Sequence, residues 1–152
     1  MKLILLTVAV FFAGVVVCRA DDPHMGIWKL NEAKSHFAKG ATKNNTVAYE
    51  AAGDMTKVTV DGTDGDGNAV HSEWTGKFNG RYYAVTGSPT SNMRAYRRIN
   101  ARTLAFTEKK GKQVVVSGRI TVSRDGKTRT VTTTSTNAKG KWIHNTAVYD
   151  KQ

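Results

Sequence analysis

Apolar and polar residues alternate with a period of two over several stretches of the chain. The clearest case is residues 113–123, where apolar side chains fall on one face and polar side chains on the other. The apolar face comprises Val114, Val116, Ile120 and Val122, and the polar face comprises Gln113, Ser117, Arg119, Thr121 and Ser123. In residues 128–136 four threonines share one face, opposite Val131 and Thr133. This period predicts β-strands in a sheet that has at least one solvent-exposed face.

Clusters of Gly, Asn, Asp and Pro separate these runs at short intervals, as in 64–67 and 79–80, which is typical of hairpins. The predicted strands span about 26–31, 44–52, 55–62, 68–77, 81–86, 92–99, 102–109, 113–122, 128–136 and 141–150. Only residues 32–39 have a helical composition, and Asn31 is placed to cap them. One short helix near the N-terminus is therefore the most that we expect.

Ten antiparallel strands are too many for one open, twisted sheet. Closure into a barrel removes the exposed edges, whereas two stacked sheets only shorten them. The sequence therefore predicts an all-β fold, an antiparallel meander of about eight to ten strands closed into a barrel. No linker or second composition appears, so residues 21–152 are expected to form one domain.

Residues 1–20 have the organisation of a cleavable signal peptide. Lys2 gives a positive start, residues 3–17 form an uncharged apolar run, and Ala20 ends a small-x-small cleavage site. An uncleaved membrane anchor or a lipid-modified Cys18 are the alternatives. The expected mature protein is exported, either periplasmic or secreted, and has no transmembrane segment. Cleavage would also remove the only cysteine, so no disulfide is available.

Positive charge is concentrated in one part of the chain. Residues 93–142 contain thirteen Lys and Arg but only two acidic residues, Glu108 and Asp125. The net charge of this segment, +11, equals that of the whole chain, so the remaining residues sum to zero. This asymmetry indicates an anionic partner, such as an anionic surface of the cell envelope, or simply a solvated face. Nucleic acid is not the expected partner. The residues assigned to the basic surface are Arg94, Arg97, Arg98 and Arg102.

Three segments are similar to parts of the calycins, the family of lipocalins and intracellular fatty-acid-binding proteins. Residues 26–30 read G-I-W-K-L, which resembles the opening strand of those barrels. Residues 117–127 and 146–151 resemble the eighth-strand-to-turn segment and the terminal strand of fatty-acid-binding proteins. The resemblance implies a calycin-like barrel that holds a small ligand, with Trp28 plugging one end.

The same resemblance implies a partial carboxylate clamp. Arg119 and Tyr149 match two members of the fatty-acid-binding clamp, but Ala147 stands where its second arginine would be. We take Arg119, Tyr149, Trp28 and Trp74 as candidate ligand-binding residues. Two alternatives stay open. Arg119 is a surface residue if the polar face of its strand points outward, and the aromatic residues can equally serve only to fill the core.

No catalytic, metal-binding or cofactor-binding arrangement is readable. His71, Glu73 and His144 could approach one another, but their spacing matches no known metal motif. The acidic loop that starts at Asp64 lacks the glycine at its sixth position and the glutamate at its twelfth, so it is not a calcium loop. No catalytic residue, metal or cofactor is therefore predicted, and the protein is not expected to be an enzyme.

These observations predict an exported protein that binds a small apolar or amphipathic molecule, including an anionic one, in a calycin-like barrel. The alternative is a non-catalytic surface protein that docks on anionic polymers of the cell envelope through its basic face. A ligand-sized cavity would distinguish the two.

Overall fold

A computed structural model of the protein describes residues 22–136 and 140–152. The predicted leader at 1–20, including Cys18, lies outside the described residues. In the described part of the chain, no helix is long and apolar enough to cross a membrane.

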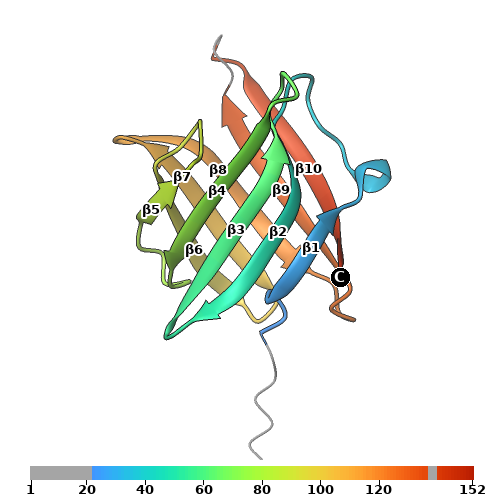
Figure 1. The fold of residues 1–152 in the computed structure, drawn as a ribbon, viewed down its shortest axis with the longest axis vertical. Helices are drawn as coiled ribbons and strands as arrows, with labels where there is room; N and C mark the ends of the chain where they lie inside the picture. The colour runs from blue at the N-terminus through green and yellow to red at the C-terminus, as the bar shows by residue number, and fades with distance from the viewer. Residues whose placement is uncertain (1–21, 137–139) are drawn as a thin grey trace, which may run out of the picture.

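Ten antiparallel strands in the described residues follow one another around a closed barrel. Figure 1 shows the strands tilted across the barrel, with the start of β1 and the end of β10 at its lower end. The strands are β1 (Gly26–Leu30), β2 (Lys43–Ala52), β3 (Met55–Thr63), β4 (Ala69–Gly76), β5 (Tyr83–Thr86), β6 (Met93–Asn100), β7 (Thr103–Lys110), β8 (Gln113–Val122), β9 (Thr128–Thr136) and β10 (Trp142–Lys151). The all-β meander predicted from the sequence is confirmed.

Strand β1 closes the barrel because it pairs with both β2 and β10. Trp28 is opposite Lys151 of β10, and Leu30 is opposite Tyr149. The first and last strands are thus joined along the edge that an open sheet would leave exposed. This is the architecture that the calycin resemblance implies, with Trp28 fully buried next to the closing strand.

The segment 32–39, where the sequence allows one short helix at most, stays within that bound. Only one 3-10 turn forms, η1 (Glu32–Lys34), and Asn31 caps it by accepting a hydrogen bond from the Lys34 amide at 3.2 Å. The following residues turn to β10 instead, because His36 forms a two-way backbone bridge with Thr146. The Ser35 hydroxyl also accepts from the Val148 amide at 2.9 Å. Tertiary pairing with β10 therefore replaces the rest of the helix.

Side chains alternate between the barrel interior and solvent as the sequence pattern predicts. On β8, Ile120 and Val122 are buried whereas Ser117, Arg119 and Thr121 are exposed. The core is a single cluster, and its largest fully buried side chains include Trp28, Trp74 and Leu104. Aromatic rings pack in and beside this cluster: the rings of Trp74 and Phe78 stack at 6.3 Å, and Tyr96 meets Trp74 edge-on at 4.8 Å.

Candidate ligand-binding site

The barrel interior holds a cavity of about 810 Å³. Residues 40–42 and 88–90 border it at the upper end, and Arg129 and Tyr149 border it toward the aromatic core. Apolar side chains from seven strands form its walls, namely Val47, Val60, Val70, Phe106, Val116, Ile120, Val131 and Ile143. A cavity of this volume is within the range of small-molecule sites in proteins.

Arg129 forms part of the cavity floor. It is the second residue of β9, is 2% exposed, and points inward from a strand whose alternate residues point outward. Three aromatic rings surround its guanidinium, with Cζ at 4.7 Å from the ring centre of Tyr149, 4.9 Å from Tyr49 and 5.1 Å from Trp28. Such contacts stabilise a buried cation without neutralising it.

The Arg129 guanidinium has donors without acceptors. Its Nε and Nη1 atoms are buried and make no hydrogen bond. No carboxylate in the described residues forms an ion pair with it. A buried charge left without an opposite charge or full hydrogen bonding is costly, so this side chain is poised to accept an anionic partner.

A second arginine lines the cavity but is already paired. Arg94 of β6 is opposite Glu108 of β7, and its Nη2 lies 2.8 Å from Glu108 Oε1. The Ser91 hydroxyl donates to Glu108 Oε2 at 2.7 Å, and Arg94 Nη1 donates to the Tyr96 hydroxyl at 3.3 Å. Burial acts to lower the pKa of Arg94, but Tyr96 and Glu108 outweigh it and raise the pKa. The guanidinium of Arg94 is therefore matched by the carboxyl group of Glu108 inside the barrel.

Tyrosine hydroxyls near both arginines stay protonated. Burial raises the pKa of Tyr149 to about 12, with Arg129 lowering it and Tyr49 raising it. Burial also raises the pKa of Tyr96 well above its usual range. Both lining hydroxyls are therefore neutral at physiological pH and able to donate a hydrogen bond.

Of the predicted ligand-binding residues, Tyr149 alone borders the cavity. Trp28 and Trp74 are core residues, 0% and 1% exposed, and each donates its indole N–H to a main-chain carbonyl, of His24 and Arg94 respectively, at 2.9 Å. Arg119 is exposed on the outer face of β8, which is the surface alternative left open by the sequence. The arginines inside the barrel are instead Arg94 and Arg129.

The predicted basic surface needs one correction. Arg94 is 7% exposed inside the barrel, because it shares the inward face of β6 with Tyr96. Arg97, Arg98 and Arg102 are on the exterior. Arg98 is engaged in an ion pair with Asp22, which ties the segment before β1 to β6.

The candidate metal cluster does not assemble. His71 of β4 forms a 2.6 Å contact with Asp61 of β3 on the exposed outer face. His144 is on β10, where it contacts Thr134 of β9 at 3.1 Å. Within 22–136 and 140–152, no group of three or more His, Cys, Asp or Glu side chains could hold a metal ion.

No family model matches the chain, and no curated protein matches it. Solved structures of β-barrels show a similar arrangement. One is described as EF1p2_mFAP2b bound to DFHBI, at 12% identity over 88% of this chain and 98% of that chain, with a TM-score of 0.49. A second is a redesigned β-barrel, mFAP1, bound to DFHBI. It is 13% identical over 85% of this chain and 95% of that chain, with a TM-score of 0.48. A third is a fluorescence-activating β-barrel designed de novo. It is 14% identical over 84% of this chain and 93% of that chain, with a TM-score of 0.42. The fold described above rests on this chain's own strand pairing.

Proposed function

We propose that this protein is an exported binding protein that holds one small apolar or amphipathic molecule inside its barrel. The observation that carries this proposal is the cavity of about 810 Å³, whose lining includes eight Val and Ile side chains. An apolar cavity with a few fixed polar groups is the usual form of a small-molecule site. A solid interior would instead have favoured the basic exterior as the functional surface.

The cavity chemistry supports binding rather than catalysis. Glu108 is the carboxylate among the lining residues, and both of its oxygens are occupied, by Arg94 and Ser91. Tyr149 is held in its neutral form, with its pKa raised by burial to about 12. Among the described lining residues no carboxylate is therefore free to act as a general base, and we propose a non-catalytic role.

Native mass spectrometry of the purified mature protein tests the proposal, because a molecule held in the cavity should co-purify. Thr133 and Thr132 of β9 provide a matched pair of variants: Thr133 lines the cavity, whereas Thr132 is exposed on the outer face. We expect Thr133→Trp to fill the cavity and lose the bound mass, and Thr132→Trp to keep it. A folded wild-type protein that carries no small molecule and binds no apolar probe would contradict the proposal.

Export is part of the proposal and has its own test. The leader resemblance predicts cleavage between Ala20 and Asp21. N-terminal sequencing of exported material should therefore begin at Asp21. A chain that starts at residue 1, or that carries a lipid on Cys18, would contradict this form of export.

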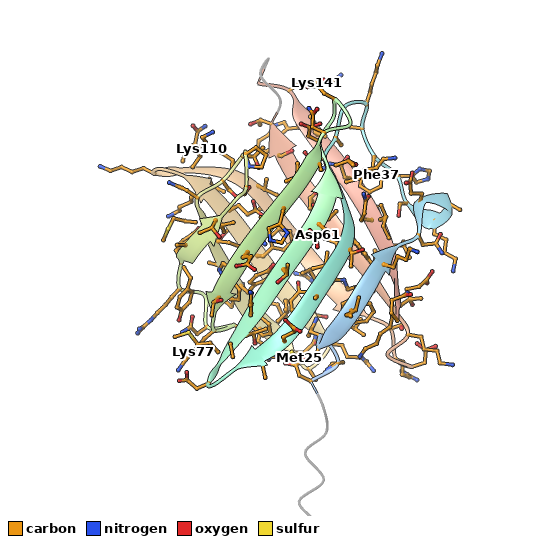
Figure 2. The ribbon with its side chains drawn as sticks, in the orientation of Figure 1. Met25, Phe37, Asp61, Lys77, Lys110 and Lys141 are labelled. Atoms are coloured by element: carbon orange, nitrogen blue, oxygen red, sulfur yellow. The ribbon has the colours of Figure 1, made fainter. Side chains whose placement is uncertain are left out.

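Docking on an anionic envelope surface remains the second candidate. It is supported by Arg97 and Arg102, which are exposed on the exterior near the β6–β7 turn. Lysines add positive charge at the cavity end, where Lys110 and Lys141 lie at the upper end of the barrel (Figure 2). The two functions are compatible, because one uses the interior and the other the exterior.

A further inference from the structure

We propose that the barrel takes a monoanionic amphiphile head-first, with the anionic group against the Arg129 guanidinium at the cavity floor. This inference rests on the proposed function, since it names the class of molecule that the same cavity would take. It extends that function by assigning a charge, an orientation and a recognition residue.

Charge balance within the cavity is the first step. The charged lining residues in the described chain are Arg94, Glu108, Lys110 and Arg129. Lys110 is exposed at the upper end, where its Nζ donates to the Pro89 carbonyl at 3.2 Å. Arg94 and Glu108 neutralise each other at 2.8 Å. One buried positive charge, on Arg129, is left over, so a single negative charge would balance the interior.

Hydrogen-bonding capacity is the second step. Arg129 is 2% exposed and keeps two buried N–H donors without acceptors. An anionic oxygen is the acceptor that gains most from a guanidinium, because charge-assisted hydrogen bonds are shorter and stronger than neutral ones. Tyr149 borders the same part of the cavity and is opposite Arg129 in the β9–β10 pairing. Its neutral hydroxyl is a further donor.

The position of Arg129 sets the orientation. Arg129 lies next to the β8–β9 turn at the lower end, whereas residues 40–42 and 88–90 border the cavity at the upper end. Between them, the apolar side chains of Val47, Val60 and Val131 are among those that line the cavity. A molecule with its acid at the floor would therefore place an apolar body along these walls.

The calycin resemblance did not point to Arg129. It pointed to Arg119, which is ten residues earlier and on the outer face of β8. Arg119 therefore serves as the matched control: it is an arginine on the neighbouring strand, directly opposite Thr132 of β9, and does not border the cavity.

A pair of fluorescent probes tests the inference on the wild-type protein. 1-Anilinonaphthalene-8-sulfonate and N-phenyl-1-naphthylamine share the same rings and differ by one sulfonate. We expect one site per chain and an affinity for the sulfonate about tenfold or more above that for the neutral amine, the scale of a charge-assisted hydrogen bond. Dodecanoate should displace the sulfonate probe at lower concentrations than dodecanol.

Variants then assign the preference to Arg129. Arg129→Met keeps an unbranched apolar stem against the three rings, and should lower sulfonate affinity by about ten- to a hundredfold while changing amine affinity less than about twofold. Arg129→Lys should restore part of the preference because it returns a cation. Arg119→Met should change neither affinity. Circular dichroism and urea unfolding establish that each variant is folded.

The outcomes separate the two proposals. Equal wild-type affinities for the two probes, or a sulfonate preference that survives in folded Arg129→Met, would overturn the anion site and leave the binding function standing. Binding of neither probe would overturn both. If Arg129→Met fails to fold, the wild-type comparisons of the two probes and of dodecanoate with dodecanol still decide the inference.

Discussion

Trp28 donates its indole N–H to the main-chain carbonyl of His24 at 2.9 Å, and both residues are fully buried. The residue that fills the lower end of the barrel therefore also holds the segment that precedes β1. Lys151 of β10 lies over the same ring, with Nζ at 5.3 Å from its centre. One side chain thus joins the segment before β1, the first strand and the last strand.

The stability of the closed end should depend strongly on this ring. We expect Trp28→Ala to lower the free energy of unfolding by about 3–5 kcal/mol, because it removes a large packed aromatic and leaves a cavity. Urea unfolding measures the change. Trp142→Ala is the matched control, since that ring is 67% exposed and its loss should cost less than about 0.5 kcal/mol. Equal losses in the two variants would contradict this account of the core.

Strand positions could be predicted closely from the sequence, because alternation and turn residues mark both the body and the ends of each strand. The predicted 113–122 and 128–136 match β8 and β9. The bound of one short helix within 32–39 is met by a single 3-10 turn, but its small extent could not be read from the sequence, because the composition favours a helix while the bridge from His36 to Thr146 favours an extended chain. That bridge joins residues 110 positions apart and leaves no local signal.

The site was less accessible to sequence reasoning. Arg129 lies two residues before Val131 and four before Thr133, so the three side chains fall on the same face of β9. This alternation indicates that Arg129 points inward. The concentration of positive charge in residues 93–142 predicts that Arg94 belongs to a basic surface, whereas the structure buries it beside a carboxylate. Its partner, Glu108, is set by the β6–β7 register, which shifts between Arg98 and Asn100, and a shift of this kind is not readable from composition.

Acid should destabilise the protein through His24. Burial lowers the pKa of His24 from its ordinary 6.5 to about 4; Asp22 opposes this shift, and Arg98, Arg129 and Lys151 add to it. The unfolded chain therefore binds a proton near pH 6.5 that the folded chain resists. The stability contributed by neutral His24 is complete above pH 6.5 and is lost as the pH falls toward 4, by about 2–3 kcal/mol after allowing for partial screening.

Two histidine variants isolate this contribution. In urea unfolding between pH 7 and 4.5, His24→Phe should flatten the decline in stability, because a neutral ring replaces the titrating one next to Phe78. His36→Phe should leave the decline unchanged, since His36 is exposed. A pH profile that is identical in the wild type and in His24→Phe would rule out His24 as the source.

Binding to an anionic surface should depend on salt if the exterior arginines form a docking face. Retention on phosphatidylglycerol vesicles should be strong at low ionic strength and weaken as the Debye length falls from about 30 Å at 0.01 M to about 8 Å at 0.15 M. The double variant Arg97→Glu and Arg102→Glu should weaken it most. Arg119→Glu with Arg124→Glu makes the same change in net charge at exposed positions on and after β8. Equal weakening by both double variants would indicate a net-charge effect without a docking face.

The Arg94–Glu108 pair should show the cost of stranding a charge inside the barrel. Glu108→Gln leaves the Arg94 cation, 7% exposed, without its carboxylate, and we expect about 3–5 kcal/mol of destabilisation in urea unfolding. Combining Glu108→Gln with Arg94→Met removes the stranded charge, so the double variant should be more stable than Glu108→Gln alone. Glu73→Gln, which breaks the exposed Lys57–Glu73 pair, should have little effect. If the double variant is no more stable than Glu108→Gln, the loss arises from packing and not from a stranded charge.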